Sequence, residues 1–592
     1  MLDGCTPWPE EFARRYRAEG YWQDITLGQM LDRTAARVPD RMAVVDGAKS
    51  ATYRQLVERS DRLAAQFAAL GLKARDRVIF QLPNSIELLY AFFALLRIGV
   101  IPVMALPAHR LSELEHFAGH AEAVAHLIPA PDARMDYLQL ARDVQDAAPT
   151  LRWIIAADLP ANAAGQASSR PAERMGDAGI AGDTGIAGGT GGTGTGPMAG
   201  VVSLADMLAT EVDEEAVARV RREAFADAGD VALMILSGGT TARSKFIPRT
   251  HNDYVYNCRQ SGAVAGFDES TVYLAVLPMA HGYTLSSPGM LATFAVGGTV
   301  IVAPDIRAET VFPLIEKHRV TVLAAGVPLV VAWLDSPWPE RVDLSSLKIC
   351  MNGGSRLLPE LRRQVEERFA CTYVESYGAG EGLLNQTRPD DPEEIRFHSS
   401  GRPVSPADEV RVVGPDGREV PDGEIGELQV RGPYTVRGYY RAPEMTAAAF
   451  TPDGFYRMGD AVRKVGDYLY LEGRLKDLIN RGGEKISVEE VENHIVAHPA
   501  VSDVCVVAMP DPKYGEKACA FVIAKAGETI TFEELQSFLL ARGIARFKLP
   551  ERLEVVDAFP LSPAGKVLRR ELRARIARQV QGGPIAENTA EQ

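Results

Sequence analysis

Residues 236–251, LSGGTTARSKFIPRTH, combine glycines, hydroxyl side chains and a lysine in one short segment. The apolar run before them, VALMILS, predicts a strand, and the small residues that follow leave backbone N–H groups open to an anion. The residues that could hold phosphate are Ser237, Gly238, Gly239, Thr240, Thr241, Ser244 and Lys245. Because the spacing is not GxxxxGK[ST], the segment predicts a phosphate loop that is not of the Walker type, with an ordinary turn as the alternative.

Three further motifs contain residues that suit a nucleotide. YGAGEG (377–382) places Tyr377 beside a glycine-rich loop and supplies Glu381, a carboxylate suited to a Mg²⁺ ion on ATP. GFYRMGD (454–460) ends in Asp460, which could accept both hydroxyls of a ribose. SPAGKVLRR presents Lys566 from a tight turn near the end of the sequence. Each motif alone is also typical of a surface turn, but together they favour a site for ATP.

Repeated strand and helix patterns predict the scaffold that positions these motifs. RVIF reads as a strand, PNSIELLYAFFALLRIG as a helix capped by Asn84 or Ser85, and VIPVMAL as the next strand. The same order recurs in TVYLAVLP, GGTVIVAP, ETVFPLIEKHR and VTVLAAG. We therefore expect a layered α/β protein with largely parallel sheets.

The chain of 592 residues is too long for a single hydrophobic core, so we expect more than one domain. We assign residues 1–474 to a large N-terminal domain and residues 475–592 to a smaller α+β domain. Within the first, residues 161–200 form a Gly-rich segment that we expect to be a flexible surface insertion. The PDG turns and short alternating strands of about 402–474 predict a small β subdomain.

Composition narrows the classes of partner. The formal net charge of -14 argues against nucleic acid as a partner. The six cysteines show neither CxxC pairs nor zinc-site spacing, so we expect reduced thiols rather than a metal site or a disulfide framework. The N-terminus lacks an apolar signal region, and the most apolar stretch is broken by Arg97, Gly99 and prolines. We expect a cytoplasmic protein with no membrane segment.

The motifs LSGGTTARSKFIPRTH, YGAGEG, GFYRMGD, GRLKDLINRGGEKIS and PAGKVLRR occur in the order found in the adenylate-forming superfamily, which the chain resembles. That superfamily contains acyl-CoA synthetases and the adenylation domains of peptide synthetases. PRTHNDYVYN, LPMAHGYTLSSPG and EGLLNQTRPDDPEEI are more similar to the stand-alone aryl-acid AMP ligases, such as the 2,3-dihydroxybenzoate and salicylate ligases of siderophore assembly. The resemblance covers nearly all of the chain except residues 161–200.

The resemblance implies a reaction in two steps. A carboxylate attacks the α-phosphorus of ATP and displaces pyrophosphate, and a pantetheine thiol then attacks the acyl adenylate. Charge compensation and alignment are the main tasks, because carboxylate and polyphosphate repel each other. The second step is reached by rotation of the mobile C-terminal domain.

The resemblance also implies roles for individual residues. Lys566 and His281 are assigned to catalysis, and Glu381 to the metal. Gly353, Gly354 and Tyr377 are assigned to the adenine, Asp460 and Arg474 to the ribose, and the loop 237–245 to the β and γ phosphates. Lys476 is assigned to the hinge, and Gly482 and Gly483 to the lining of the thiol tunnel.

For the acid itself, the resemblance implies a pocket that includes Gly282, Tyr283, Ser287, Gly353 and Leu384. Related sequences usually carry Asn where this chain has Gly282, so one hydrogen-bonding side chain is missing and we expect the vacated volume to admit a larger ring or substituent. Ser287 matches the dihydroxybenzoate type, whereas Leu384 is closer to the salicylate type. The acid is thus expected to be 2,3-dihydroxybenzoate, salicylate or a larger analogue.

The thiol acceptor has two candidates. An aryl carrier protein acting in trans, in siderophore or related nonribosomal peptide synthesis, is the first, and free coenzyme A, which would make the protein an aryl-CoA ligase, is the second. A non-catalytic adenylate-binding protein is disfavoured because Glu381, Asp460 and Lys566 are all present.

Overall fold

The protein is described from a computed structural model. The described residues are 1–132, 135–159, 200–223, 225–237, 244–354, 356–357, 359–475, 477–481, 484–561 and 567–580. Except for Gly200, the predicted insertion lies outside them. The chain forms two compact units, the first of Met1–Ser237, Arg243–Arg259 and Asp268–Pro304, and the second of Gly238–Ala242, Gln260–Phe267 and Asp305–Gln592.

A seven-stranded sheet forms the centre of the first unit. Its order is β7-β6-β5-β3-β4-β8-β9. The strands are β3 (Arg77–Phe80), β4 (Ile101–Met104), β5 (Ala125–Ile128), β6 (Trp153–Ala156), β7 (Gly200–Ser203), β8 (Val231–Leu236) and β9 (Phe246–Thr250). All neighbouring strands are parallel except β8 and β9, which are antiparallel and flank the predicted phosphate loop. The expectation of a largely parallel sheet is confirmed here.

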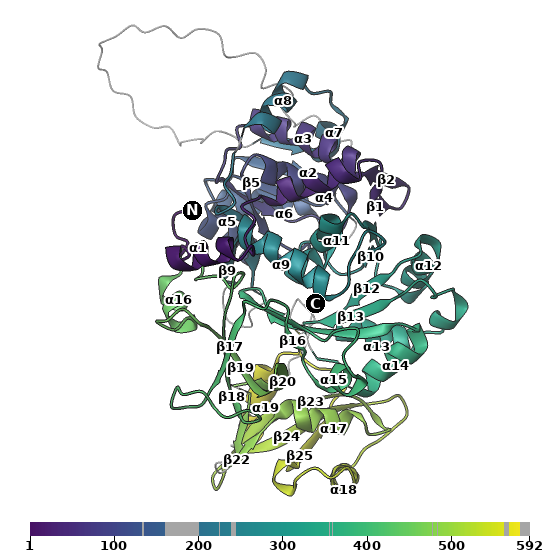
Figure 1. The fold of residues 1–592 in the computed structure, drawn as a ribbon. Helices are drawn as coiled ribbons and strands as arrows, with labels where there is room; N and C mark the ends of the chain where they lie inside the picture. Colours follow the sequence, from purple (N-terminus) through teal and green to yellow (C-terminus); the bar gives the residue numbers. More distant parts are fainter. Residues whose placement is uncertain are drawn as a thin grey trace, which may run out of the picture. The chain divides into compact units, whose positions relative to one another are not determined.

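The same unit contains four strands that pair in the order β10-β11-β1-β2, together with most of the helices drawn in purple and blue in Figure 1. The strands are β1 (Met42–Asp46), β2 (Lys49–Thr52), β10 (Val272–Ala275) and β11 (Thr299–Val302). The helices are α1 (Glu10–Ala18), α2 (Leu27–Arg37), α3 (Tyr53–Ala69), α4 (Ile86–Arg97), α5 (Leu111–Ala121), α6 (Tyr137–Ala147), α7 (Leu204–Ala209), α8 (Glu214–Arg222), α10 (Gly282–Ser286) and α11 (Met290–Val296). Of α9 (His251–Val264), the residues up to Arg259 belong to this unit.

Helix α4 illustrates how the sequence sets these elements. Ser85 accepts a hydrogen bond from the backbone N–H of Leu88, so Ser85 rather than Asn84 caps the helix. Asn84 instead donates to the carbonyl of Leu277 at 2.9 Å and accepts from the N–H of Met279 at 2.7 Å. This amide thereby fixes the segment that leads into α10.

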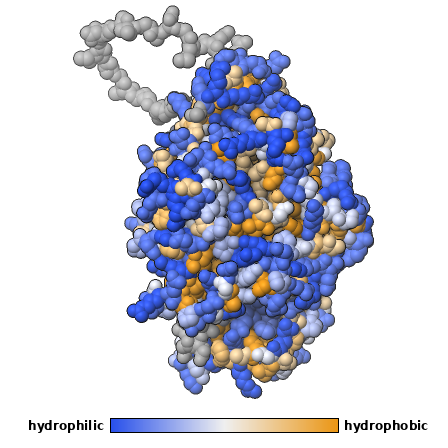
Figure 2. All heavy atoms as spheres, viewed as in Figure 1, coloured by the Kyte–Doolittle hydropathy of each residue, from blue (hydrophilic) through white to orange (hydrophobic). Residues whose placement is uncertain are grey.

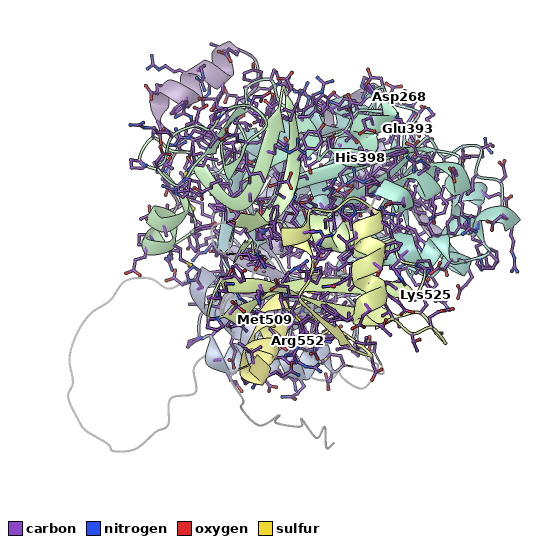
Figure 3. The ribbon with its side chains drawn as sticks, turned by 90° about the horizontal axis from the view of Figure 1, so that it is seen from below. Asp268, Glu393, His398, Met509, Lys525 and Arg552 are labelled. Carbon is purple, nitrogen blue, oxygen red and sulfur yellow. The ribbon has the colours of Figure 1, made fainter. Side chains whose placement is uncertain are left out.

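In the second unit, five strands pair in the order β12-β13-β14-β15-β16. They are β12 (Val322–Ala325), β13 (Ile349–Gly353), β14 (Thr372–Ala379), β15 (Gly382–Gln386) and β16 (Arg402–Pro403), accompanied by α12 (Ala308–His318), α13 (Val327–Leu334), η1 (Pro339–Arg341), α14 (Pro359–Phe369) and α15 (Glu393–His398). Figure 3 labels Glu393 and His398, the two ends of α15. Arg356 donates to the carbonyl of His398 at 2.6 Å, which ties the chain just after Gly353 and Gly354 to this helix.

An antiparallel sheet of four strands covers the region where the small β subdomain is predicted. It consists of β17 (Glu409–Val413), β18 (Ile425–Arg431), β19 (Tyr456–Val465) and β20 (Tyr468–Arg474), with α16 (Pro443–Ala449) between β18 and β19. Its core includes Leu428, Val462 and Leu469, and Leu383 of β15 packs into it.

The residues beyond 477 form an α+β arrangement. Its strands are β21 (Ile479–Arg481), β22 (Glu484–Ile486), β23 (Val501–Asp511), β24 (Gly515–Ala524) and β25 (Arg552–Val555), and its helices are α17 (Val488–Val496), α18 (Phe532–Ala541), η2 (Arg546–Lys548) and α19 (Arg569–Val580). Helices α17 and α19 both contact β23. Figure 3 labels Met509 of β23 and Arg552 of β25, and Arg552 donates to Gln579 of α19 at 3.3 Å. The predicted domain division at 474 stays a prediction.

Hydrophilic side chains cover most of the face drawn in Figure 2, and the apolar residues on it lie in separate groups. Among the described residues, no helix has both the length and the apolar character required to cross a bilayer. The buried apolar side chains of the C-terminal region form a hydrophobic core that includes Ile486, Val491 and Leu535.

Candidate active site

The two ends of the predicted phosphate loop are joined at its base. The N–H of Ser237 donates to the carbonyl of Lys245 at 3.0 Å, and the N–H of Lys245 donates to Oγ of Ser237 at 2.9 Å. Nε2 of His116 lies 3.1 Å from the carbonyl oxygen of Ser244, and because a carbonyl only accepts, Nε2 carries the proton. Ser237 keeps its own O–H as a donor, as a phosphate contact requires. Gly238, Gly239, Thr240 and Thr241 lie outside the described residues.

His281 and Gly282 lie at the start of α10, also in the first unit. Nδ1 of the exposed His281 accepts from the N–H of Tyr283 at 3.3 Å, which caps the helix. Ser286 Oγ donates to the carbonyl of Gly282 at 3.2 Å, and Ser286 and Ser287 hydroxyls lie 3.2 Å apart. The structure thus brings His281, Gly282, Tyr283 and Ser287 together on one short helix and its caps.

The space beside Gly282 is bordered by a residue of β8. A Cβ atom on residue 282 would lie 3.2 Å from Cδ1 of Ile235, 3.7 Å from its Cγ2 and 4.0 Å from the hydroxyl oxygen of Tyr254. In the direction of a Cβ atom the space is therefore limited by Ile235 of β8, and the expectation that the pocket admits a larger ring or substituent stays a prediction. Sequence reasoning could not find Ile235, which had only the signal of an apolar strand residue.

In the second unit, the residues assigned to adenine and ribose come together. The hydroxyl of Tyr377 donates to Oδ2 of Asp460 at 2.6 Å, and Nε of Arg474 lies 2.9 Å from Oδ1 of the same carboxylate. Strand register explains this, since Asp460 and Arg474 are directly opposite on β19 and β20. Gly353 pairs with Ser376, the residue before Tyr377. Gly354 has φ +90°, and a Cβ atom there would meet nothing within 4 Å.

Burial determines the charge states in this group. It raises the pKa of the Asp460 carboxyl, while Arg474 and Tyr377 act in the opposite direction. Burial and the neighbouring Asp460 raise the pKa of Tyr377 well above its usual value, so its hydroxyl stays protonated and donates. Each Asp460 oxygen already has one partner in the protein, and each still has a lone pair for a ribose hydroxyl.

Glu381 is buried between β14 and β15, with its carboxylate held by tyrosine. The hydroxyl of Tyr439 donates to Oε1 at 2.8 Å, and the N–H of Val436 donates to the Glu381 carbonyl at 2.7 Å. Burial and the charge of Glu381 raise the pKa of both Tyr439 and Tyr456, so both keep their protons. A buried carboxylate in a fixed orientation fits the oxygen ligand that Mg²⁺ prefers.

A second tyrosine of the same segment holds Leu384. The N–H of Leu384 donates to the hydroxyl oxygen of Tyr434 at 3.1 Å, and that hydroxyl donates to Oδ2 of Asp408 at 2.6 Å. Burial raises the pKa of Asp408 to about 8. A Cβ atom on Gly382 would lie 2.4 Å from Cα of Thr435, so the two chain segments are in close contact.

Residues 434–439, which we call the strap, therefore hold the turn and strand that carry Glu381 and Leu384. The sequence pattern of this segment indicates only that it belongs to the β subdomain. Four other predicted site residues lie outside the described residues: Lys566, Lys476, Gly482 and Gly483.

Comparison with known proteins identifies the family. The family model for the AMP-binding enzyme matches residues 31–440, and the family model for the AMP-binding enzyme C-terminal domain matches residues 490–566. The chain belongs to the AMP-binding enzyme family.

Members of this family resemble the chain over nearly its whole length. A 2,3-dihydroxybenzoate-AMP ligase of Bacillus subtilis (strain 168) is 44% identical over 98% of this chain and 99% of that protein. A salicylyl-CoA synthase / salicylate adenylyltransferase of Streptomyces sp is 42% identical over 96% of this chain and 97% of that protein. The apo structure of Mycobacterium smegmatis MbtA is 36% identical, with a TM-score of 0.67, and the match covers 97% of this chain and 99% of that chain.

These similarities confirm the resemblance to aryl-acid AMP ligases within the adenylate-forming superfamily. They also confirm the α/β fold class with a large N-terminal part and a small α+β C-terminal part. The roles of individual site residues stay predictions.

Proposed function

We propose that the protein activates an aryl carboxylic acid with ATP and transfers the aryl group to the phosphopantetheine thiol of an aryl carrier protein. The acid is 2,3-dihydroxybenzoate, salicylate or a larger analogue, and the pathway is siderophore or related nonribosomal peptide synthesis. The observation that carries the proposal is the 44% identity to a 2,3-dihydroxybenzoate-AMP ligase over 98% of the chain. The grouping of Tyr377, Asp460 and Arg474 supports it, since all three are assigned to one nucleoside.

In the first step, a carboxylate oxygen forms a bond to the α-phosphorus of ATP, and the bond from that phosphorus to the bridging oxygen breaks to release pyrophosphate. Asp460 and Arg474 would hold the ribose, and the loop that begins at Ser237 would hold the outer phosphates. Lys566 would compensate the charges of the two reacting anions. Mg²⁺, when bound at Glu381, supplies further positive charge on the phosphate oxygens.

In the second step, the thiol sulfur forms a bond to the acyl carbon, the bond to the AMP oxygen breaks, and the thiol proton leaves to solvent or a base. The C-terminal residues would rotate about Lys476 between the two steps. Gly482 and Gly483 would then line the path of the pantetheine arm.

The proposal is tested by ATP–pyrophosphate exchange with a panel of aryl acids and with alkyl acids of similar size. Exchange that depends on an aryl acid is the expected result, and exchange only with alkyl acids would refute the assignment. Glu381→Gln should abolish most of the exchange, whereas Glu424→Gln, which removes the same charge from an exposed residue of the β subdomain, should leave it intact.

Free coenzyme A is the second candidate acceptor, and the similarity to the salicylyl-CoA synthase / salicylate adenylyltransferase of Streptomyces sp supports considering it. Mass spectrometry after incubation with acid, ATP and either coenzyme A or a phosphopantetheinylated aryl carrier protein separates the two. Faster formation of the aryl thioester on the carrier protein is expected; a larger kcat/KM for coenzyme A would make the protein an aryl-CoA ligase.

A further inference from the structure

Ile235 and Gly282 come from different elements of the first unit and lie close together. Ile235 is the penultimate residue of β8 and is 9% exposed, while Gly282 begins α10. The distance of 3.2 Å from Cδ1 of Ile235 to a Cβ atom on residue 282 is shorter than an ordinary van der Waals contact. A side chain at 282 and the full side chain of Ile235 therefore compete for the same space.

The backbone does not explain the glycine. Gly282 does not adopt a positive φ, so any L-amino acid could take up its backbone conformation. Its carbonyl is fixed by the Ser286 hydroxyl at 3.2 Å, so the start of α10 is held in place. The side chain of Ile235 is therefore the obstacle to a larger residue at 282.

We propose that Ile235 is a specificity-determining residue, which closes the acid pocket at position 282 and gives it an apolar wall there. This inference rests on the proposed function, in which Gly282 and Ser287 border the acid. An apolar wall cannot hydrogen-bond a ring hydroxyl, so this edge of the pocket should select by size and not by polarity. The acid group that faces it should be a ring C–H or a small apolar substituent.

The position of Ile235 gives the proposal a control within the same protein. β8 leads directly into Ser237 and the predicted phosphate loop, so damage to the strand should alter the KM for ATP. A change confined to the apolar wall of the acid pocket should alter the order of preference among acids and leave the KM for ATP unchanged. Each variant is therefore measured against both substrates.

The test uses a double-mutant cycle on the full chain. Ile235→Val removes Cδ1, the atom at 3.2 Å, and leaves Cγ2 at 3.7 Å, which is an ordinary contact distance. Gly282→Asn alone should lower kcat/KM for every acid about tenfold or more, because the added side chain meets Ile235. In the double variant, kcat/KM should recover and should favour 2-hydroxybenzoate over 2-methylbenzoate relative to the parent.

Ile235→Val alone should raise kcat/KM for 2-methylbenzoate relative to benzoate by about tenfold, the usual effect of one methyl group in an apolar pocket. Ile301→Val is the matched control, because it removes the same methyl group from a buried residue of β11 in the same unit. It should leave the order of preference unchanged. Melting temperatures of all variants show whether each one is folded.

Two results would overturn the proposal. One is an equal loss from Gly282→Asn with and without Ile235→Val in folded proteins, which would show that the two side chains do not compete. The other is the same change of preference in Ile301→Val as in Ile235→Val. A parent protein that shows no exchange with any aryl acid would instead refute the proposed function, so the two failures are distinguishable.

Discussion

Tyr439 donates a hydrogen bond from its hydroxyl to Oε1 of Glu381 at 2.8 Å, across 58 positions of the sequence. The bond fixes one oxygen of a carboxylate that is 7% exposed. Because the pKa of Tyr439 is raised by burial and by Glu381, the tyrosine remains a donor over the working pH range. The orientation of the predicted metal ligand is therefore set by a residue of the strap.

Tyr439→Phe should raise the Mg²⁺ concentration required for half-maximal exchange by about tenfold, because a hydrogen bond to a charged group contributes about 1.5–3 kcal/mol. In calorimetry, the variant should bind ATP more weakly than the parent when Mg²⁺ is present. Without Mg²⁺, the two proteins should bind ATP with nearly the same affinity. Tyr468→Phe, which removes a donor to Asp391 at 2.6 Å, is the matched control. Equal losses with and without Mg²⁺ would assign Tyr439 a purely structural role.

Tyr434→Phe should act on the acid and not on the nucleotide. Without the Tyr434 hydroxyl, the N–H of Leu384 loses this acceptor and Asp408 loses one donor, so the strand that carries Leu384 is less firmly held. We expect KM for the acid to rise about three- to tenfold, the effect of losing about one ordinary hydrogen bond. Steady-state kinetics with each substrate varied in turn checks this, and an effect confined to KM for ATP would contradict it.

Asp408→Asn should make the protein relatively more stable as pH rises. Burial raises the native pKa of Asp408 from 3.8 to about 8, so the native protein binds this proton more tightly than the unfolded chain. The resulting stabilisation is complete below the unfolded pKa and is lost as pH rises towards 8, with a slope of at most about 1.4 kcal/mol per pH unit. Asn resembles the neutral acid and has no such loss.

Urea unfolding at several pH values between 4 and 8 measures this difference. The stability of Asp408→Asn minus that of the parent should increase steadily with pH. The exposed Asp467→Asn serves as the control and should give a difference that hardly depends on pH. A flat difference for Asp408→Asn would mean that its carboxyl is ionised in the native protein.

Lys566→Ala should separate the two half-reactions. A lysine that compensates the carboxylate and the α-phosphate acts only in adenylation, so ATP–pyrophosphate exchange should fall by orders of magnitude. Thiol transfer from supplied aryl adenylate should be largely retained. Rapid-quench assays of each step measure this, and equal losses in both would indicate a structural lysine and refute the alternation of the C-terminal domain.

Deletion of residues 165–197 should have little effect on folding or activity. The segment contains almost no large apolar side chains, and the cost of loop closure changes slowly with loop length. Thermal unfolding and exchange activity of the deletion variant test this expectation. A variant that fails to fold would show that the segment contributes to the structure.

The local sequence was sufficient to predict the elements and the family. Apolar runs and caps such as Ser85 specify strands and helices through neighbouring residues, so the α/β class and a largely parallel sheet could be anticipated. Asp460 and Arg474 were assigned to one ribose through the family resemblance, and the register of β19 and β20 places them together. Short-range sequence patterns predict these helices and strands because their hydrogen bonds join residues that are close in the chain or paired on neighbouring strands.

Tertiary structure alone decided how the site is lined and held. The sequence shows a missing side chain at Gly282, but only packing shows that Ile235 borders the position. Tyr434 meets Leu384 across 50 positions, and Tyr439 meets Glu381 across 58. Such contacts depend on close packing between distant segments, which leaves no periodic signal in the chain. The sequence therefore determined the chemistry that the protein can perform, and the fold decided the walls and supports of the site.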